Sequence, residues 1–478
     1  MTLAAVAKSL PSAEIVTPDL AVDIARFATN LDASRLSPVV VAAVKANILD
    51  TLACAIAGSS AKGIGELSDL VREWAGAPQA TMLVLGGRFP AHHVAWVNGS
   101  MAHARDYDDT HDAAVLHAGV STVPAALAAA QLHGKVSGAD LIAAVAAGLE
   151  VTCRLGMATK IGVIESGYMY TSLLGYFGAT VAAGRAMSLT PEQMVNAIGI
   201  VYSSAAGNHQ VTRDAALTKR MQPGFAAQAA VAAVQVAKRG IRGVQKTFEG
   251  IDGFFRVYLH NNCNGADVRA GLGERFELLN LSYKPYPCCR YNHSAVDATL
   301  QARARMQRAA SDIKSIRVGV TAQCYEAVCT PEEVRRSPRT IVEAQFSIPY
   351  TVAASWIDGR LGLSHFTDES LRRADILDLA TRVQPYVDAD IEREWSRNIS
   401  PAKVNIQFTD GQTLETRVDY PKGHPKSPMS LADIEAKVDD CARFAAKPLP
   451  ADTARRLTAA IKGLDSLADI SDLVGILS

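Results

Sequence analysis

The amino-acid sequence predicts a mainly α protein in which a large helical domain is accompanied by a smaller α+β domain. Three observations carry this prediction. Apolar residues recur at helical spacing from residue 18 to about residue 268. Segments that alternate apolar and polar residues, as half-buried strands do, occur after about residue 280. Helical spacing then returns over Leu431–Leu477.

These changes of pattern predict the domain organisation. We expect an all-helical domain at 18–272, with 429–478 packing back on it, so that this domain is discontinuous in sequence. Residues 273–428 are expected to form the α+β lid domain. Residues 1–17 are expected to form a flexible leader, because they lack the basic start and the apolar core of a signal peptide.

The helices of the first domain are predicted from apolar residues at i, i+3 and i+4. Two of them begin with a capping hydroxyl followed by proline, at Ser37-Pro38 and Thr190-Pro191. Abundant Ala and Gly allow close approach, which favours a tightly packed bundle. The predicted helices are Leu20–Asn30, Pro38–Ala57, Ile64–Trp74, Phe89–Tyr107, Thr122–Leu132, Gly138–Leu155, Ser172–Ala186, Pro191–Ser203 and Phe225–Arg239.

The second domain is predicted from three alternating segments and the helical patterns between them. Val404–Phe408 and Leu414–Val418 flank an Asp-Gly pair, which is a strong hairpin signal. Ser315–Val320 alternates in the same way. The helices expected here are Asp297–Gln307, Phe346–Ile357 and Asp368–Leu379.

Composition and charge exclude several classes of function. The 478 residues contain 48 Lys and Arg against 48 Asp and Glu, so nothing favours a nucleic-acid or membrane-surface partner. We expect no membrane-spanning segment, because the most apolar stretches, around Pro124–Leu132 and Leu141–Leu149, are short and interrupted. Eight cysteines in so long a chain form no disulfide framework and predict reduced thiols in the cytoplasm.

The densest polar cluster runs from His103 to Asp112, followed by His117. His103, Asp106 and Thr110 share one face if the preceding helix continues. Three aspartates in four positions need compensation by a metal, by cations or by backbone donors, unless they project into water from a solvated helix end. No HExxH or CxxC spacing predicts a zinc site.

The same residues leave a remote alternative open. Asp108–Asp112 fits the DDxxD pattern with which helical prenyl and terpene synthases hold magnesium and diphosphate. Such enzymes need a second acidic motif and aromatic walls around a carbocation. The sequence contains no convincing second motif, and aromatic residues make up 6% of it.

Two cationic segments are candidates for carboxylate recognition. Lys284, Arg290 and His293 lie among prolines that keep the backbone extended, and arginine can grip a carboxylate with two parallel hydrogen bonds. Lys219 lies in a cationic turn before a predicted helix, where an anion can bind. A linker and a surface turn are the alternative interpretations. No phosphate loop, GxGxxG or GxSxG motif occurs, so no organic cofactor is expected.

Taken together, these motifs resemble the MmgE/PrpD family, which includes 2-methylcitrate dehydratase, cis-aconitate decarboxylase and iminodisuccinate epimerase. Asn98–His103 running into Asp106–Thr110 carries the resemblance, which extends from about Leu20 to Ala436. Further matches are Thr218–Arg220 with Gly224, Lys284–Asp297, Ala344–Pro349 and Asp410-Gly411.

The resemblance implies a helical domain and a lid domain with the active site between them, a homodimer, and no metal or organic cofactor. The family's catalytic positions fall on Asp106, Thr110, His117, Lys219 and Lys284. The residues expected to bind substrate are His103, Tyr170, Arg290, His293 and Tyr325.

The implied activity is that of a lyase acting on a small di- or tricarboxylate by proton transfer at the carbon next to a carboxylate, as in 2-methylcitrate dehydratase. Lys219 and Lys284 would hold carboxylates, and His117 and Asp106 are the acid–base candidates. An epimerase or isomerase of an amino- or imino-dicarboxylate and a cis-aconitate-type decarboxylase are the alternatives within the family. The non-enzymatic alternative is a helical interaction protein that kept the fold and lost catalytic activity.

The sequence departs from the family pattern at two positions. Met169 and Gln222 stand where many members have histidine, and Tyr168 or Tyr170 could substitute in part. A substrate with fewer or differently placed carboxylates would also explain the change.

Overall fold

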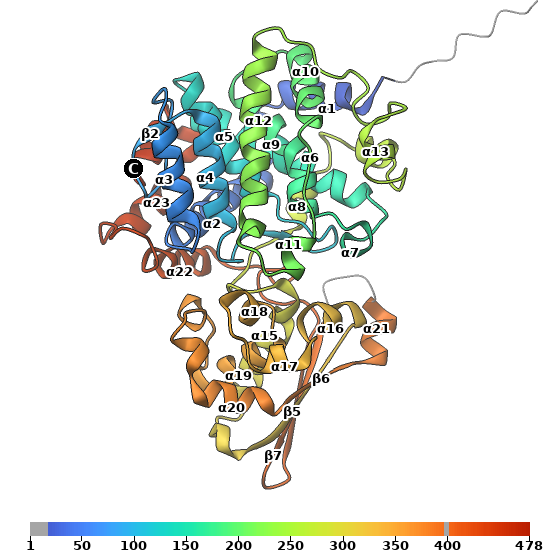
Figure 1. The fold of residues 1–478 in the computed structure, drawn as a ribbon, viewed down its shortest axis with the longest axis vertical. Coiled ribbons are helices and arrows are strands. Elements are labelled where there is room, and N and C mark those ends of the chain that lie inside the picture. Colours follow the sequence, from blue (N-terminus) through green and yellow to red (C-terminus); the bar gives the residue numbers. More distant parts are fainter. Residues whose placement is uncertain (1–17, 396–400) are drawn as a thin grey trace, which may run out of the picture.

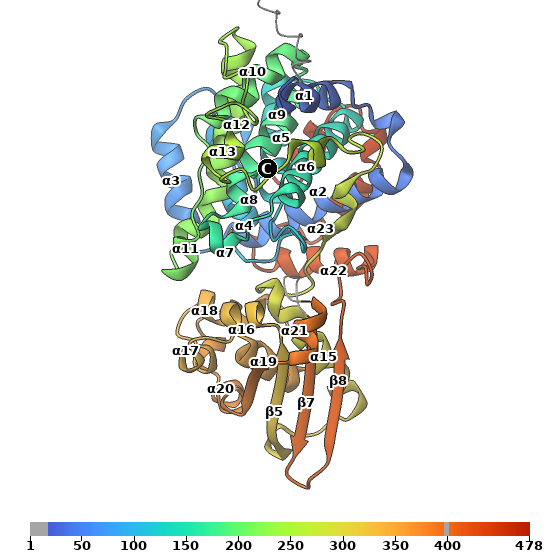
Figure 2. The same cartoon turned by 90° about the vertical axis from the view of Figure 1, so that its right-hand side faces the viewer.

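The computed structural model describes residues 18–395 and 401–478, and the chain is mainly α-helical, as predicted (Figure 1). A helical part, made of 18–281 and 431–478, lies above a smaller α+β part, made of 282–428 (Figures 1 and 2). The expected leader, 1–17, lies outside the described residues.

Local capping signals define where several long helices begin. The Ser37 hydroxyl accepts a hydrogen bond from Val40 N–H, and Thr190 forms a reciprocal capping box with Gln193. Both helices therefore begin at the predicted prolines. The long helices are α1 (Leu20–Asn30), α2 (Pro38–Gly58), α3 (Ile64–Trp74), α4 (Ala91–His103), α5 (Gly119–His133), α6 (Gly138–Ala158), α9 (Gly175–Ala186), α10 (Pro191–Tyr202) and α12 (Gln222–Lys238).

Small residues allow the central helices α5, α6, α9 and α12 to pack closely. A Cβ atom added to Gly148 of α6 would lie 2.6 Å from the carbonyl oxygen of Gly178 on α9. The two backbones therefore approach to a distance that no larger residue permits at this crossing.

Several short elements of the helical part contain polar residues. These elements are the strand β3 (Thr110–His111), the helices α8 (Tyr170–Leu173) and α11 (Gln210–Arg213), and a 3₁₀ turn at Leu217–Met221. The helices α8 and α11 lie at the end that faces the α+β part (Figure 1). Shorter or peripheral elements are β1 (Ala80–Thr81), β2 (Arg88–Phe89), α7 (Val163–Ser166), α13 (Phe254–Val257) and α14 (Gly265–Arg269).

The α+β part contains a four-stranded sheet with the order β6-β5-β7-β8. β5 (Ile313–Val320), β7 (Ala402–Phe408) and β8 (Thr413–Val418) are antiparallel neighbours and match the predicted strands. β6 (Val383–Val387) runs parallel to β5 at the edge and was not predicted. The helices are α15 (His293–Arg305), α16 (Ala322–Val328), α17 (Glu332–Arg336), α18 (Ile341–Gln345), α19 (Ile348–Asp358), α20 (Ala374–Thr381) and α21 (Ala389–Trp395).

The C-terminal helices pack on the helical part, as Figure 1 shows for α22 (Leu431–Ala442) and α23 (Thr453–Lys462). The last of them is α24 (Ser471–Gly475). One hydrophobic core consists of residues from 20–281 and 434–477 together with Leu363, and a second core consists of residues from 286–418.

The premise that no segment is long and apolar enough to span a bilayer was wrong. Two helices of 21 residues, α2 and α6, meet that test by length and composition, with mean hydropathies of 1.8 and 1.6. Their apolar windows are 67% and 94% buried inside the protein. Their hydrophobicity is therefore explained by their places in the first core.

Candidate active site

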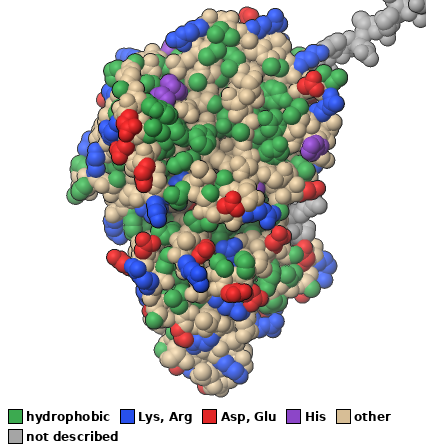
Figure 3. Space-filling model, viewed as in Figure 1, with side chains coloured by type: hydrophobic (Ala, Val, Ile, Leu, Met, Phe, Trp, Pro, Cys, Tyr) green, Lys and Arg blue, Asp and Glu red, His purple; other side chains and the backbone are tan. Residues whose placement is uncertain are grey.

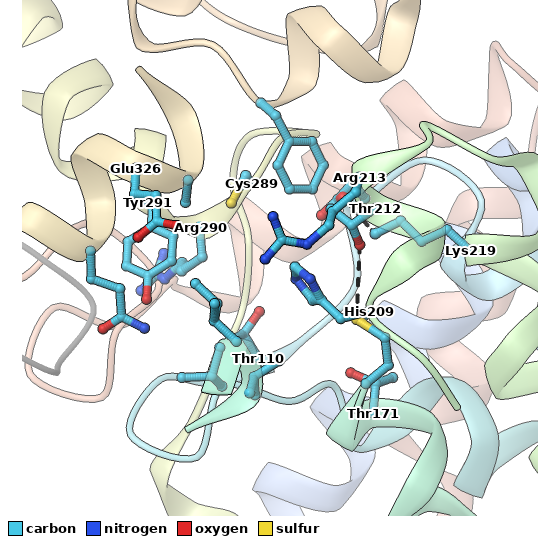
Figure 4. A pocket seen from close by; sticks show the side chains of 18 of the residues that line it. Thr110, Thr171, His209, Thr212, Arg213, Lys219, Cys289, Arg290, Tyr291 and Glu326 are labelled. Atoms are coloured by element: carbon cyan, nitrogen blue, oxygen red, sulfur yellow. Dashed lines mark hydrogen bonds and ion pairs between the residues drawn. The ribbon is translucent and has the colours of Figure 1, made fainter. Parts of the chain in front are cut away.

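A cavity of about 410 Å³ lies between the helical part and the α+β part (Figure 4). The helical part contributes residues near 106–117, 163–171 and 209–219, and the α+β part contributes residues near 284–291 and 323–346. Five lysines and arginines line it, against two carboxylates. Its wall is therefore suited to an anionic molecule.

The motif helix ends before it reaches the cavity. α4 stops at His103, and Asp106 adopts a left-handed backbone conformation with φ of +53°. Thr110 and His111 form β3, which pairs with Leu281–Ser282 (β4). The predicted shared helix face of His103, Asp106 and Thr110 was wrong, because a turn and a strand place these residues instead. Since β4 ends two residues before Lys284, this pairing also brings Lys284 to Asp106.

Asp106 is held by two lysines from different parts of the chain. Lys219 Nζ lies 3.0 Å from Oδ2, and Lys284 Nζ lies 2.5 Å from Oδ1 and 2.9 Å from the Asp106 carbonyl oxygen. Burial alone would raise the pKa of Asp106, but Lys219 and Lys284 outweigh it and hold that pKa well below its ordinary value. Asp106 therefore stays ionised, and it is unsuited to the acid–base role predicted for it.

A buried carboxylate orients two histidines. Asp108 Oδ2 lies 2.8 Å from His103 Nδ1 and 2.9 Å from His117 Nδ1. His117 Nδ1 is also 2.6 Å from the Asp109 carbonyl oxygen. Both acceptors fix the proton of His117 on Nδ1, so its other ring nitrogen, Nε2, is left for the cavity.

His103 supports Lys219 rather than lining the cavity. Burial lowers the pKa of His103 to about 4 in spite of the neighbouring Asp108, so its ring is neutral near pH 7. Nδ1 donates to Asp108, which leaves Nε2 to accept from Lys219 Nζ, 3.4 Å away. His103 therefore positions the lysine that was predicted to bind substrate beside it.

His103, Asp108 and His117 are also the one set of described residues whose ligand atoms are close enough to share a metal ion. Their geometry fits hydrogen bonding better. Both Nδ1 atoms lie at hydrogen-bond distance from a single carboxylate oxygen, and the free nitrogen of His103 faces an ammonium group. A cation bound here would have to displace both protons next to that ammonium group.

The remaining aspartates of the acidic cluster are used inside the protein. Asp109 accepts from the N–H groups of Ala118 and Gly119 at the start of α5, and Asp112 contacts Ser282 and Arg290. Neither carboxylate faces the cavity, so Asp108–Asp112 offers no paired ligands for a magnesium diphosphate.

The predicted substrate-binding residues are placed in different ways. Tyr170 and Arg290 line the cavity, but Arg290 is paired with Asp112 and Tyr170 donates to the Ile161 carbonyl oxygen. His293 is fully buried behind the wall, between Arg290 and the Cys288 carbonyl oxygen. Tyr325 does not reach the cavity, since its hydroxyl donates to Glu332.

Four cavity residues were not anticipated from the sequence: His209, Arg213, Tyr291 and Arg335. Tyr291 lies inside the Lys284–Asp297 motif but was not singled out, whereas His209, Arg213 and Arg335 lie outside any recognisable motif. Only the small polar stretch around His209 hints at an ordered loop. Met169 lines the cavity, where its sulfur lies 3.9 Å from the Thr212 hydroxyl (Figure 4). Gln222 is buried, and its amide bonds to both the N–H and the carbonyl oxygen of Asn208.

Comparison with known proteins matches nearly the whole chain. The model of the MmgE/PrpD N-terminal domain matches residues 22–265, and that of the MmgE/PrpD C-terminal domain matches residues 286–464. The chain is 27% identical over 475 residues to cis-aconitate decarboxylase of Aspergillus terreus, covering 95% of each chain. It is 26% identical over 461 residues to cis-aconitate decarboxylase of Homo sapiens, covering 94% of this chain and 93% of the relative.

Proposed function

Because the chain belongs to the MmgE/PrpD family, with relatives of lyase type, we propose that it is a cofactor-independent carboxy-lyase acting on a small tricarboxylate of the cis-aconitate kind. The observation that carries the proposal is the shared use of Asp106 by Lys219 and Lys284 next to the fixed ring of His117.

The two lysines leave binding capacity for a substrate. An ammonium group has three N–H donors. Lys284 uses two of them on Asp106, and Lys219 uses one on Asp106 and one on His103 among the described residues. One donor remains on each lysine, and two positive charges face one negative charge. A substrate carboxylate completes both the hydrogen bonds and the charge balance.

In the proposed step, the substrate carboxylate that Lys219 and Lys284 bind accepts the electrons released when a different carboxylate of the substrate is lost. The carboxylate on the methylene carbon of the substrate leaves as CO₂, and its bonding pair forms a new double bond. The former double-bond pair moves to the carbon next to a second carboxylate, which becomes an enediolate. Fixed cations stabilise that developing charge before the reaction begins, so little reorganisation is needed.

His117 is proposed to deliver the proton that completes the reaction. With Nδ1 bonded to Asp108 and to the Asp109 carbonyl oxygen, Nε2 is the nitrogen that can carry a proton into the cavity. One C–C bond breaks, one C–H bond forms at the carbon next to the carboxylate, and one proton is consumed. A positioned acid of this kind contributes about 10² to 10⁴ in rate.

Hydration or dehydration of a hydroxy acid, as in 2-methylcitrate dehydratase, is the second candidate. The hydroxyls of Thr110 and Tyr291 line the cavity, are buried, and have no hydrogen-bond partner among the described residues. A substrate hydroxyl group would satisfy one of them. This observation is the reason for keeping the dehydratase as the second candidate.

One experiment separates these reactions. The purified protein is treated with chelator and incubated in deuterated water with cis-aconitate, 2-methylcitrate or iminodisuccinate, and products are followed by NMR. We expect CO₂ release and one deuterium at the carbon next to a carboxylate, with no loss of activity to the chelator. A new alkene without CO₂ supports the dehydratase, exchange without net change supports the epimerase, and no reaction with any of them contradicts the lyase proposal.

We also propose a cytoplasmic homodimer formed through the helical part. No disulfide bond joins any of the eight cysteines, all of which lie within the described residues, and this is consistent with a reducing compartment. Hydrophobic side chains gather on the helical part in Figure 3, and Trp74 and Ile241 are 50% and 55% exposed. Light scattering should give about twice the chain mass at micromolar concentration; a mass near 51 kDa would contradict the dimer.

A further inference from the structure

One wall of the cavity is formed by the segment from Gly207 to Arg213, which none of the steps above uses. His209 and Arg213 both line the cavity, and Figure 4 shows the ring of His209 and the guanidinium of Arg213 directed into it next to one another.

The segment is held in place by contacts that do not involve these two side chains. The amide of Gln222 pairs with the backbone of Asn208, and His209 N–H donates to the Gly167 carbonyl oxygen at 2.8 Å. Gly207 has a φ of +141°, where an added Cβ would lie 2.9 Å from Ser172. The backbone is therefore fixed before any ligand binds, which lowers the entropic cost of binding.

Both side chains lack partners. The Nδ1 atom of His209 is buried and has no hydrogen bond to any described residue. Arg213 is solvent-exposed and forms no ion pair with the described carboxylates, so its N–H groups are open to an acceptor in the cavity. Burial and the nearby cations Arg213 and Lys219 lower the pKa of His209. For the buried Nδ1 of His209, the lack of a partner costs about 1–3 kcal/mol, so a ligand that satisfies it binds favourably; the exposed Arg213 carries no such cost.

We propose that His209 and Arg213 form a second carboxylate subsite, which selects substrates carrying a carboxylate in addition to the one held by Lys219 and Lys284. The inference rests on the proposed function, because it concerns the same cavity. Arginine offers two parallel donors to a carboxylate, and the histidine nitrogen that lies unpaired in the free protein gains a partner.

The subsite also explains Gln222, which stands where many relatives were expected to have histidine. Its side chain does not face the substrate; it fastens the backbone one residue before His209. A histidine therefore reaches the cavity from a different segment, and Gln222 is a positioning residue for it.

The test measures binding and needs no turnover. Tricarballylate, a saturated tricarboxylate, and butyrate, which keeps one carboxylate, are titrated against the full-length protein by ligand-observed NMR. The variants are His209→Gln and Arg213→Gln, with Arg239→Gln as a control on the exposed end of α12. We expect the dissociation constant of tricarballylate to rise at least tenfold in both subsite variants, and that of butyrate to change less than twofold.

Three results would overturn the inference. Unchanged tricarballylate binding in both variants removes the subsite and leaves the proposed function standing. An equal rise in the dissociation constants of both ligands would mean that His209 and Arg213 only contribute positive charge to the whole cavity, and this result would also remove the subsite. A wild-type protein that binds neither ligand removes the carboxylate site at Lys219 and Lys284 together with the subsite.

Discussion

Two buried lysine–aspartate pairs lie near each other in this protein, and they have different chemistry. Lys437 of α22 contacts Asp50 of α2 at 2.6 Å, and Lys284 contacts Asp106 at 2.5 Å. The side chains of both lysines are at most 1% exposed. Lys437 donates to Asp50, to the Tyr107 carbonyl oxygen and to the Lys284 carbonyl oxygen, so all three of its donors are used.

The active-site pair differs in donors and in charge. Lys284 keeps one donor free of the described residues, and Lys219 adds a second positive charge to the same aspartate. Asp50 has one lysine and no other cation in an ion pair within the described chain. The Lys437–Asp50 pair, in which all the lysine donors are used, links α22 to α2. The Lys284–Asp106 pair, which keeps a free donor and has the extra charge of Lys219, lies at the cavity. The surplus of positive charge and of free N–H donors, more than burial, distinguishes Lys284, the lysine proposed to bind substrate, from Lys437.

Lys437→Met should produce the largest effect, and it is an effect on stability. The change removes the cation and leaves Asp50, whose pKa burial raises, without its partner in the core, and breaking such a pair costs about 3–5 kcal/mol of unfolding free energy. Urea unfolding should show this loss. Lys462→Met, which breaks the exposed pair with Glu435, should cost less than about 1 kcal/mol. Equal losses in the two variants would mean that Lys437 is no more important to the fold than a surface lysine.

Asp109 is a buried carboxylate that has no lysine partner among the described residues, so its protonation can be compared with that of Asp106. Among the described residues it has no ion pair with a lysine or arginine, and burial together with Asp108 raises its pKa to about 7. The folded protein therefore holds a proton that the unfolded chain releases near pH 4. The contribution of Asp109 to stability should be greatest below pH 4 and fall by about 1.4 kcal/mol per pH unit up to about pH 7, or roughly 4 kcal/mol in total.

Asp109→Asn removes that titration and keeps an acceptor for the N–H groups of α5. The unfolding midpoint of the wild type should fall relative to the variant between pH 5 and pH 7, and the two curves should run parallel above pH 8. Parallel curves over the whole range would show that Asp109 is ionised in the folded protein, in spite of having no lysine.

Lys284→Met should inactivate the protein with a smaller loss of stability than Lys437→Met. Lys219 still compensates Asp106 after the change, so no carboxylate is left alone in the core. The lost contact to a substrate carboxylate in a closed site costs roughly 2–5 kcal/mol, or about 30- to several-thousand-fold in kcat/KM.

Lys219→Met should behave in the same way, and Lys160→Met, which affects an exposed pair, serves as the control. Activity within about threefold of wild type in both active-site variants would remove the lysines from the reaction. A stability loss as large as that of Lys437→Met would instead make Lys284 a structural lysine.

The sequence predicted well those features that are written locally. Ser37-Pro38 and Thr190-Pro191 define helix starts within a few residues, and the Asp-Gly turn predicts the hairpin of β7 and β8. Strand β6 escaped prediction because Pro385 interrupts the pattern, which is tolerated at the edge of a sheet where β5 supplies the pairing.

Most of the residues predicted for the candidate site line the cavity, but their geometry was not predicted. The motif helix was extended to Tyr107, but it stops at His103 because Asp106 turns toward lysines 113 and 178 residues further along the chain. No local pattern encodes such contacts. Lys437 meets Asp50 across 387 residues, and His209 depends on an amide from Gln222, so both were missed for the same reason.

Asp108→Asn should give the smallest effect, because asparagine keeps an oxygen acceptor between the two histidine rings and removes only the charge. Asp108 is buried like Asp50, but its hydrogen-bond partners are His103 and His117, and it has no ion pair with a lysine or arginine among the described residues. A hydrogen bond to a charged group is worth about 1.5–3 kcal/mol, which sets the loss in kcat at roughly ten- to a hundredfold. Because Asp108 does not line the cavity, KM should stay within about threefold of wild type. Steady-state kinetics measure kcat and KM, and Asp140→Asn on the surface serves as the control. A rise in KM with unchanged kcat would mean that Asp108 shapes the carboxylate site and does not orient His117 as the proton donor.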